Sequence, residues 1–436
     1  MPLATARGRI ASLLPASRTS RSFLVVSLID ALGTGMFLAG SPLFFTLTLG
    51  LSTGQVGVGL TLSGLAGMLG LIPIGRLADR WGSKRMLIAL NLWRGGCFAA
   101  YPFVTGPVSF FVVSFAIGLA EWSVAPVVQA LIGTAEEGQS RVRTMATMGS
   151  IRNAGFTIGA LLATVVVAVG SSRSYNAMVF LDAASYFVAA GMVLRLVVPT
   201  AAGPVRGDRA RLRYRLHDNR YLVLTVLNGL LYLHTVLLAV GVPLWVATRT
   251  SAPRAVVALV LVVNTAVVIV GQVPLSRGSD DPQRAARRQQ WSGFSLAACC
   301  LLVGLTGHTN AWITTGLVVL AVGALSLAEM WQSIGGWGIS YAYAPAEQLS
   351  YYLSVYNLGI TGAVIVGPVL LTLAVIPAGL PGWLMLAAVF VAGGTAVVLV
   401  TAKAQVHPES LTAARGTPPP ADVEAETLPT QLDQAG

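Results

Sequence analysis

The sequence predicts an all-α polytopic membrane protein with twelve transmembrane helices, arranged as two pseudo-symmetric six-helix halves. Three observations lead to this fold class. Hydrophobic residues make up 55% of the 436 residues and charged residues only 10%, which is too apolar for a soluble domain. Runs of about 20 apolar residues, the length that crosses the hydrocarbon layer, recur along the chain. Short sequence matches also relate the first half of the chain to the second.

Each predicted span is a continuous apolar run that lacks the alternation of a transmembrane strand, so helices fit better than a barrel. The N-terminal half, 23–198, holds spans at 23–49, 55–75, 86–105, 107–133, 145–170 and 175–198. The C-terminal half, 220–401, holds spans at 220–248, 252–276, 289–307, 311–334, 348–376 and 380–401. Residues 1–22 form an N-terminal arm, 199–219 a linker, and 402–436 a tail whose composition predicts disorder.

The basic residues predict the orientation of the spans. Of the 28 Lys and Arg residues, only Arg173, Arg249 and Arg254 fall in loops on one side, while Arg94 and Arg152 fall within spans. The others lie in the arm, linker, tail and remaining loops, or, as Arg195 and Arg220 do, at the span ends beside them, and the positive-inside rule places this side in the cytoplasm with both termini. The net charge of +11 comes with no nucleic-acid-binding motif, so nucleic acid is not an expected partner. The preference for Arg over Lys indicates a GC-rich bacterial genome and hence the inner membrane.

The two halves match at a shift of about 200 residues, which indicates duplication. The matching pairs are PIGRLAD (73–79) with PLSRGSD (274–280), LAEW (119–122) with LAEM (327–330), NAGFT (153–157) with NLGIT (357–361), and SPLF (41–44) with VPLW (242–245). Parallel repeats of this kind place a substrate site between the halves near the membrane midplane, and access alternates as the halves rock.

A group of charged residues separates the second span from the third. The stretch GRLADRWGSKR contains Gly75, Leu77, Asp79, Arg80, Gly82, Lys84 and Arg85. These residues match the G-x-L-A-D-R-x-G-[RK]-[RK] signature of the major facilitator superfamily, which the chain resembles over about residues 20–402. The resemblance implies the fold of that superfamily, and it implies that this loop latches the halves together on the cytoplasmic side in the outward-facing state. A positive-inside anchor is the alternative, for which Lys84 and Arg85 suffice.

The physical properties of the signature agree with a latch. Gly75 and Gly82 permit close approach and a tight turn, and Asp79 can face a helix N-terminus. Arg277 and Asp280 form a degenerate second copy that lacks the second glycine. The segments VPLSRGSDDPQRAARR, NAGFTIGALLA and LDAASYF are similar to bacterial members grouped with macrolide, siderophore and drug exporters. The fourth span departs from the drug antiporters, which often carry an arginine there.

Ionisable residues inside the spans are costly and indicate function by default. Asp30, Arg94, Glu121 and Arg152 lie 7 to 12 residues from the cytoplasmic end of their spans, roughly 10–18 Å deep. At this shared level they form either a neutralising ion-pair network or a proton-coupling site that acts through Asp30 or Glu121. Glu329 has no Lys or Arg within the spans of its own half. It is therefore a candidate to carry protons or to meet a cationic substrate, with a hydrated position at the cytoplasmic mouth as the alternative.

Polar and aromatic residues in other spans are candidates for the substrate cavity. Asn153 and Asn357 begin the matched N-x-G-x-T segments and are expected to face the cavity. His234 either titrates during transport or is a hydrogen-bonded core residue. Trp122 and Trp331 either line an aromatic path for an apolar or cationic compound or belong to the interfacial belts.

These features predict a secondary transporter that exports a small, partly apolar molecule, such as a drug, antibiotic or natural product, in exchange for protons. Proton-coupled uptake and a transport-inactive sensor or scaffold are the alternatives. A membrane enzyme is disfavoured because the sequence has no H-E-x-x-H, Asp-rich prenyl-diphosphate or G-x-x-x-x-G-K-[ST] motif. We expect a monomer without cofactor, metal or catalytic residues, whose partners are substrate, protons and the lipid bilayer. Cys97, Cys299, Cys300 and Asp182 are expected to serve packing only.

Overall fold

The computed structural model describes residues 18–136, 138–196, 219–253, 255–276, 278 and 281–402, and every regular element within them is helical. The N-terminal half contains α2 (Arg18–Leu43), η1 (Phe44–Thr48), α3 (Thr53–Trp81), α4 (Ser83–Ala100), η2 (Tyr101–Phe103), α5 (Pro107–Ala135), α6 (Gln139–Val169) and α7 (Ser172–Arg195). The C-terminal half contains α8 (Asn219–Tyr232), α9 (His234–Val236), η4 (Leu237–Gly241), α10 (Val242–Arg249), α11 (Ala255–Leu275), α12 (Pro282–Leu305), η5 (Thr306–His308), α13 (Ala311–Ala342), η6 (Ala346–Gln348), α14 (Leu349–Leu370), η7 (Leu371–Val375), α15 (Ile376–Ala378) and α16 (Leu380–Ala402). The predicted arm, linker and tail lie almost wholly outside the described residues.

The predicted all-helical membrane fold is confirmed. Within the described ranges, nine helical stretches are long and apolar enough to cross a membrane. The remaining predicted spans correspond to α4, which has 18 residues, to α12, which begins with several arginines, and to α11, an apolar helix of 21 residues, so the figure of twelve crossings stays a prediction. Several helices also outrun the apolar segments: α3 ends at Trp81 rather than 75, α6 begins at Gln139 rather than 145, and α13 ends at Ala342 rather than 334. Hydropathy marks only the hydrocarbon layer, whereas good helix formers such as Arg and Gln continue a helix beyond it.

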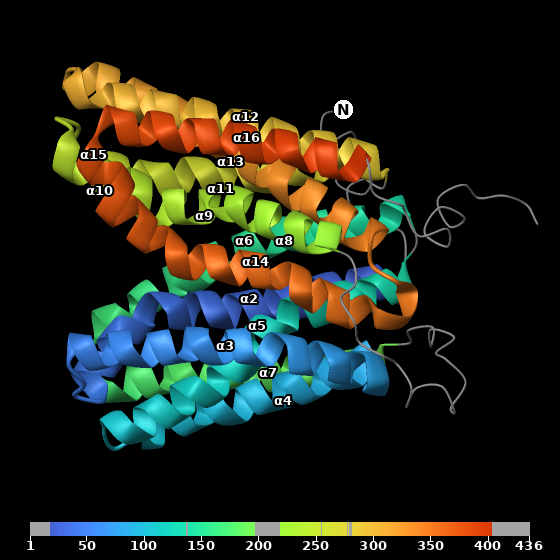
Figure 1. The fold of residues 1–436 in the computed structure, drawn as a ribbon. Helices are drawn as coiled ribbons and strands as arrows, with labels where there is room; N and C mark the ends of the chain where they lie inside the picture. The colour runs from blue at the N-terminus through green and yellow to red at the C-terminus, as the bar shows by residue number, and fades with distance from the viewer. Residues whose placement is uncertain are drawn as a thin grey trace, which may run out of the picture.

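The helices of each half pack in the same three pairs. In the N-terminal half α2 packs on α6, α3 on α5 and α4 on α7. In the C-terminal half the corresponding pairs are α8 with α14, α11 with α13 and α12 with α16. Figure 1 shows the halves as two bundles, one blue to green and one yellow-green to red, with α14 lying against the first. The halves meet through α3 with α14 and through α6 with α11, so the contact between them follows the same internal symmetry.

Glycines let the paired helices approach closely at corresponding places in the two halves. On α6, a Cβ added to Gly159 would collide with the carbonyl oxygen of Leu32 in α2. On α14, a Cβ added to Gly359 would collide with the carbonyl oxygen of Thr225 in α8. These contacts account for the two glycines by packing, as is usual for small residues between membrane helices.

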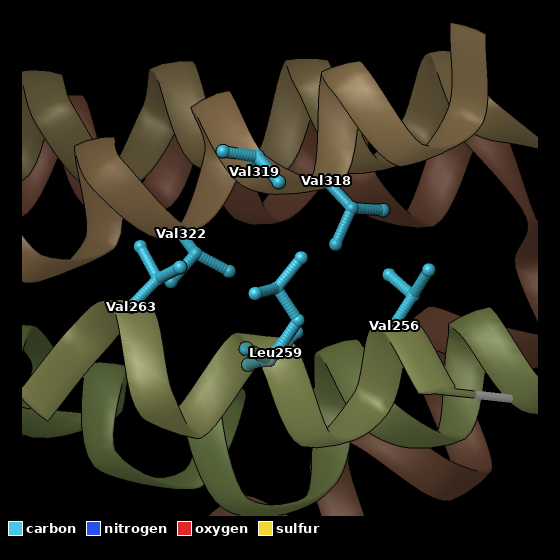
Figure 2. Close-up of a pocket in the computed structure, with 7 residues that line it drawn as sticks. Val256, Leu259, Val263, Val318, Val319 and Val322 are labelled. Atoms are coloured by element: carbon cyan, nitrogen blue, oxygen red, sulfur yellow. The ribbon is translucent and has the colours of Figure 1, made fainter. Parts of the chain in front are cut away.

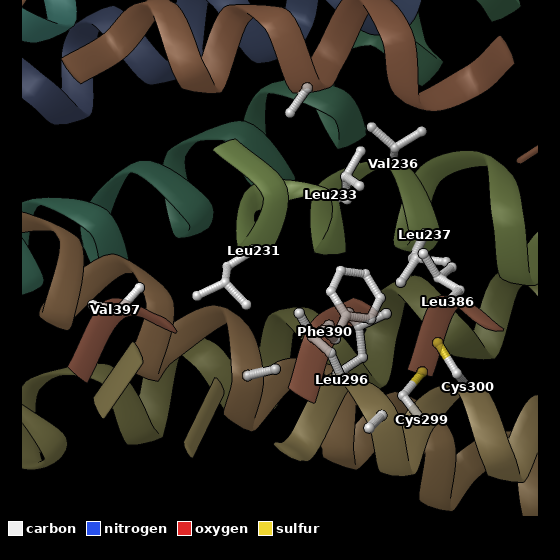
Figure 3. Packing of buried hydrophobic residues seen from close by; sticks show 14 of the residues in the cluster. Leu231, Leu233, Val236, Leu237, Leu296, Cys299, Cys300, Leu386, Phe390 and Val397 are labelled. Carbon is white, nitrogen blue, oxygen red and sulfur yellow. The ribbon is translucent and has the colours of Figure 1, made fainter. Parts of the chain in front are cut away.

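The interior of the C-terminal half is one hydrophobic cluster that includes Leu231, Leu296 and Phe390 (Figure 3). Cys299 and Cys300 are free thiols buried in this cluster, which confirms that they are packing residues. Their size and low polarity suit a close-packed apolar interior.

The signature stretch lies at one end of the bundle, on the right in Figure 1, and we call this the motif end. The end of α16 and the start of α2 lie at the same end. Instead of the predicted loop, Gly75 to Trp81 form the last turns of α3, and Gly82 alone separates α3 from α4. Gly82 has a φ of 92°, a conformation that favours glycine, so the reversal needs a single residue.

We expect Gly359→Ala to destabilise the protein by about 1–3 kcal/mol, because the new methyl group forces α8 and α14 apart. Gly362→Ala is a matched control one turn later in α14, since no atom lies within 4 Å of a Cβ added there. It should be neutral, or stabilising by up to about 1 kcal/mol through helix propensity. Thermal unfolding in detergent compares the two variants, and equal stabilities would contradict the packing role of Gly359.

Candidate functional site

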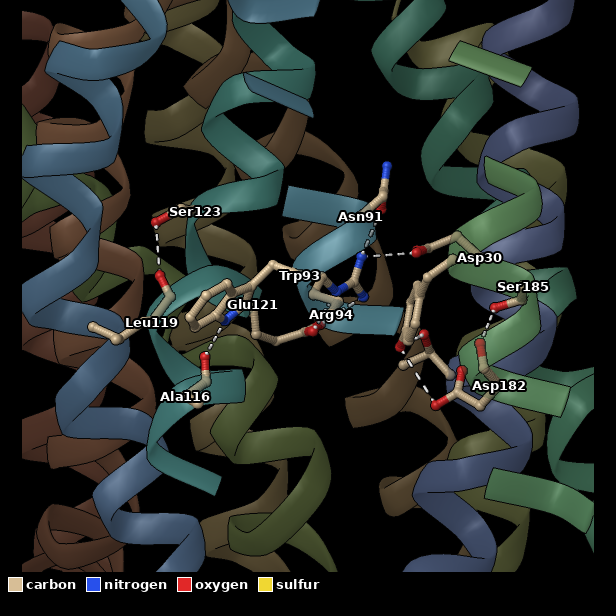
Figure 4. Close-up of polar contacts among 12 residues, drawn as sticks. Asp30, Asn91, Trp93, Arg94, Ala116, Leu119, Glu121, Ser123, Asp182 and Ser185 are labelled. Carbon is tan, nitrogen blue, oxygen red and sulfur yellow. Dashed lines mark hydrogen bonds and ion pairs between the residues drawn. The ribbon is translucent and has the colours of Figure 1, made fainter. Parts of the chain in front are cut away.

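A buried arginine joins the charged residues of the N-terminal half (Figure 4). The side chain of Arg94 in α4 is 2% exposed and binds Glu121 of α5 through two hydrogen bonds, 2.7 Å from Nε to Oε2 and 3.1 Å from Nη2 to Oε1. Its Nη1 donates to Oδ1 of Asp30 in α2 at 3.0 Å. The other Asp30 oxygen accepts from Nη1 of Arg152 in α6 at 3.2 Å. The four residues that the sequence places at one level are therefore in direct contact across four helices.

The geometry around Arg94 suits a charge removed from water. Its planar guanidinium group meets the Glu121 carboxylate in a bidentate pair, which is among the strongest hydrogen-bonding arrangements. The ring of Tyr186 lies 3.9 Å from Arg94 Cζ, and Asn91 Oδ1 accepts from Nη1 at 3.4 Å. Since an unpaired buried charge costs several kcal/mol, these contacts explain why Arg94 is tolerated here.

The members of the network differ in exposure. The side chains of Arg152 and Glu121 are 41% and 35% exposed, whereas that of Asp30 is 9% exposed. Arg152 and Glu121 are thus the more accessible members of the network. Both interpretations of the network, structural and proton-coupling, stay open at this point.

Glu329 of α13 has an uncharged environment. Its Oε2 accepts a hydrogen bond of 2.8 Å from the side-chain amide of Asn264 in α11, which also donates to Ser326 at 3.1 Å. No ion pair to Glu329 occurs among the described side chains. Tyr232 of α8 lies within electrostatic range of both Glu329 and Arg152. These two charges, one from each half, therefore flank the same region between the halves.

His234 belongs to a buried network of uncharged side chains in the C-terminal half. Its Nε2 lies 3.3 Å from Oε1 of Gln332, whose Nε2 donates to Oδ1 of Asn228 at 2.8 Å. Gln289 donates to the same Asn228 oxygen at 3.1 Å. All four residues are buried. This placement favours the core interpretation of His234, and a role in transport stays a prediction.

The two tryptophans do not converge on one site. Trp122 packs over Gly67 of α3, inside the N-terminal half. The Trp331 ring lies 6.3 Å from that of Trp291, which is 56% exposed on α12. Since α12 packs mainly on α13 and α16, Trp331 lies toward the outer side of the C-terminal half.

The two asparagines lie on helices that join the halves. Asn153 is half-buried on α6, which contacts α11. Asn357 is half-buried on α14, and its amide donates to the carbonyl oxygen of Leu353 in the same helix at 2.8 Å. A role for either residue in the substrate cavity stays a prediction.

Figure 2 shows a pocket between α11 and α13 that is lined by apolar side chains. The lining residues are Val256, Leu259, Val260, Val263, Val318, Val319 and Val322. None of them is charged or forms side-chain hydrogen bonds, so the pocket offers no group that orients a polar substrate.

Asp79 joins the halves at the motif end. Its Oδ1 accepts from the backbone N–H of Ser350 at 2.8 Å and its Oδ2 from that of Tyr351 at 3.0 Å. Both N–H groups belong to the first turn of α14, where they lack partners within the helix. A carboxylate at a helix N-terminus is stabilised by these donors and by the helix dipole. Asp79 thus faces a helix N-terminus, as its sequence context suggested.

Neighbouring residues of α3 and α4 complete this contact. Gly75 lies so close to Ser354 of α14 that a Cβ would collide with its side chain. The hydroxyl oxygens of Ser83 and Ser350 lie 3.2 Å apart. Arg76 Cζ lies 5.2 Å from the centre of the Tyr351 ring. The contact between α3 and α14 is therefore specific as well as close.

Among the other signature residues, Lys84 binds α7. Lys84 donates from Nζ to the carbonyl oxygens of Leu194 at 2.9 Å and Leu196 at 2.7 Å, which caps the end of α7. Leu77 is half-buried against the core of its own half, and Arg80 and Arg85 are exposed. Arg277 and Asp280, the predicted second copy, lie outside the described residues.

A second junction at the motif end was not foreseen from the sequence. The side-chain Nε2 of Gln129 in α5 donates to the hydroxyl of Ser340 in α13 at 2.8 Å. The backbone carbonyl oxygen of Gln129 accepts from the Tyr341 hydroxyl at 2.6 Å. Arg141 Cζ lies 5.7 Å from the centre of the Tyr341 ring. A buried glutamine in an apolar span was the available signal, because such a group must find hydrogen-bond partners.

Two further residues adjoin the charged network. Asp182 of α7 is completely buried, and its Oδ2 accepts from the Tyr186 hydroxyl at 3.4 Å. Tyr186 contacts Arg94 through its ring and lies 3.1 Å from the hydroxyl of Thr34. Their spacing of four residues places Asp182 and Tyr186 on one face of α7, which the sequence could have indicated. Asp182 therefore packs next to the network.

Comparison with family models matches residues 23–368 to the Major Facilitator Superfamily. A protein of Escherichia coli (strain K12) described as "Uncharacterized MFS-type transporter YdeE" is 25% identical over 354 residues, covering 80% of this chain and 87% of that protein. The "Multi-drug resistance efflux pump PmrA homolog" of Lactococcus lactis subsp. lactis (strain IL1403) is 29% identical over 113 residues, 26% of this chain and 27% of that protein. The solved structure of a Major Facilitator Superfamily transporter, FucP, in the outward conformation has a TM-score of 0.67 at 15% identity, and the match covers 89% of this chain and 100% of that chain.

We expect Arg94→Met to lower the free energy of unfolding by about 3–5 kcal/mol, because it leaves Glu121 without a cation in a low-dielectric site. Arg152→Met is the matched control: its side chain is 41% exposed, and Asp30 keeps its bond to Arg94. Its loss should stay below about 1 kcal/mol. Reversible unfolding in detergent, followed by tryptophan fluorescence, measures both. Equal losses would show that Arg94 does not hold the network together.

We expect Asp79→Ala to open the motif end. Ser354 is buried against Gly75 and its hydroxyl has no hydrogen-bond partner in the described part of the chain, so Ser354→Cys is a mild reporter. Hydrogen bonds to a charged group contribute about 1.5–3 kcal/mol and each 1.4 kcal/mol is tenfold, so labelling by a membrane-impermeant maleimide should rise by about tenfold or more. The background carries Cys97→Ser, and Asp281→Asn, an exposed carboxylate, is the control. Unchanged labelling in Asp79→Ala would contradict the latch.

Proposed function

Because the chain belongs to the Major Facilitator Superfamily of membrane transporters, we propose that it is a proton-coupled exporter of a small, partly apolar molecule. In this proposal the protein is a monomer of the bacterial inner membrane with both termini in the cytoplasm. The halves 23–198 and 220–401 rock around a shared substrate site. The observation that carries the proposal is the pair of partly exposed carboxylates, Glu121 and Glu329, in opposite halves: among the described side chains Glu121 forms an ion pair and Glu329 forms none.

The contacts at the motif end support alternating access. Asp79 with α14 and Gln129 with α13 join the halves at the end that the positive-inside rule assigns to the cytoplasm. A transporter closed on this side presents its site to the opposite side. Export is further supported by the relative described as a multidrug resistance efflux pump, which matches 113 residues of this chain.

The environment of Glu329 supports proton coupling. Asn264 is a neutral donor, so the carboxyl group can gain or lose a proton without the separation of an ion pair. Asp30, in contrast, binds two arginines, and Glu121 binds Arg94 in a bidentate pair. We therefore assign proton exchange in the C-terminal half to Glu329 and a stabilising role to the ion pairs of the N-terminal half. An intramembrane carboxyl group with a neutral partner is a common element of proton pathways.

Transport is tested first with the whole chain in an efflux-deficient bacterial host. Drug susceptibility and dye accumulation are measured with and without a protonophore. Lower accumulation that the protonophore abolishes supports proton-driven export. Higher accumulation that depends on the gradient indicates uptake, and no effect across a broad panel of compounds opposes export of drug-like molecules.

We expect Glu329→Gln to abolish gradient-driven transport while substrate exchange without a gradient survives, because the amide keeps the shape of the carboxyl group but holds no exchangeable acid proton. Glu347→Gln, an exposed carboxylate of η6 in the same half, is the matched control and should transport normally. Both variants are reconstituted in vesicles with an imposed pH gradient. Normal gradient-driven transport by Glu329→Gln would contradict its role as proton carrier.

A further inference from the structure

A completely buried carboxyl group lies behind the charged network of the N-terminal half. Asp182 of α7 occupies space that Gly33 of α2 leaves open, since a Cβ on Gly33 would meet Asp182 Oδ1 and the Ser185 hydroxyl. Within the described ranges, Oδ1 of Asp182 has no hydrogen-bond partner, and Oδ2 accepts from Tyr186 at 3.4 Å. Figure 4 shows Asp182 on the far side of the network from Glu121.

The charges that face Asp182 are already balanced without it. Asp30 of α2 and Glu121 of α5 are neutralised by Arg94 of α4 and Arg152 of α6, two acids against two bases. The hydrogen bonds of Arg94 go to Glu121, Asp30 and Asn91, and none reaches Asp182. An ionised Asp182 would be a third carboxylate in the same low-dielectric region without a cation of its own. A single proton on Asp182 makes the whole group electrically neutral.

Two hydroxyl groups lie in sequence next to Asp182. The Tyr186 hydroxyl donates to Asp182 and lies 3.1 Å from the hydroxyl of Thr34. Thr34 is half-buried on α2, one turn after Asp30. Hydroxyl groups both donate and accept, so a chain of this kind passes a proton by exchanging one O–H bond for the next.

We propose that Asp182 carries a proton in this conformation and is a second proton-binding group of the transport cycle, besides Glu329. The proton leaves through the hydroxyl group of Tyr186, which turns from donating to accepting, toward that of the half-buried Thr34. The net step breaks the O–H bond of Asp182 and forms an O–H bond on a water molecule beside Thr34, which leaves as hydronium while Asp182 becomes a carboxylate. This inference rests on the proposed function, because a proton carrier requires proton-coupled transport.

Infrared spectroscopy tests the protonation of Asp182 without reference to transport. The carboxylic acid C=O band is compared between wild type and Asp182→Asn, both as full-length protein in lipid. We expect the variant to lose one band that the wild type shows at neutral pH. Asp281→Asn, an exposed carboxylate whose asparagine still suits a helix N-cap, is the control and should leave the band unchanged. An unchanged band in Asp182→Asn would overturn the proposal.

Tyr186→Phe tests the connection. It keeps the ring over Arg94 and removes the hydroxyl group that binds Asp182. We expect the Asp182 band to persist but to shift, because the carboxyl group loses its hydrogen bond. An unshifted band would contradict the contact between Tyr186 and Asp182.

Transport separates a carrier from a passive buried acid. We expect Asp182→Asn to keep the thermal stability and substrate exchange of wild type, since the amide resembles the neutral acid, and to lose gradient-driven transport. A lost band with normal gradient-driven transport would refute the carrier role. If the wild type itself shows no transport that a protonophore abolishes, the proposed function fails, and the infrared result still decides whether Asp182 is protonated.

Discussion

The N-terminal half depends on one constraint: hydrocarbon does not solvate charge, so each ionised group within the bundle needs a partner inside the protein. Arg94 is the group through which this constraint is met. Arg94 donates hydrogen bonds to Glu121 of α5 and to Asp30 of α2. Asp30 also accepts a hydrogen bond from Arg152 of α6. Four helices are thereby fixed relative to one another by directional contacts, which apolar packing between membrane helices does not provide.

The two halves share the same pairs of packed helices but differ in the polar side chains buried between them. The three pairs of helices recur in both halves, yet the C-terminal half replaces the ion pairs by amides and an imidazole, Asn228, Gln289, Gln332 and His234. Amides pair with each other without charge, although Asn228 Nδ2 and Gln289 Oε1 have no hydrogen-bond partner in the described part of the chain. Glu329, a partly exposed carboxylate within a span of this half, has no ion-pair partner among the described side chains, so the two halves differ in how they hold their intramembrane charges.

Composition and periodicity sufficed for the fold class, and the depth of the ionisable residues sufficed to bring Asp30, Arg94, Glu121 and Arg152 together. Both follow from one-dimensional properties, helix rise and hydropathy. The position of Asp182 beside the network was not foreseen, because it depends on how α7 packs on α2 and α4, which sequence spacing does not specify. Gln129 was missed for the same reason, since its partners Ser340 and Tyr341 are about 210 residues away and no local pattern encodes them.

The contact between Asp79 and α14 at the motif end is of a strength that allows the two halves to separate reversibly. Asp79 accepts two hydrogen bonds from α14, and a hydrogen bond to a charged group contributes about 1.5–3 kcal/mol. Burial of the carboxylate offsets part of this gain, so the two contributions do not simply add. A shift between two states from 1:99 to 99:1 requires about 5.5 kcal/mol, so the latch biases the conformation without fixing it. Its donors are backbone N–H groups at a helix end, which water can satisfy when the halves separate, so opening leaves no buried polar group without a partner.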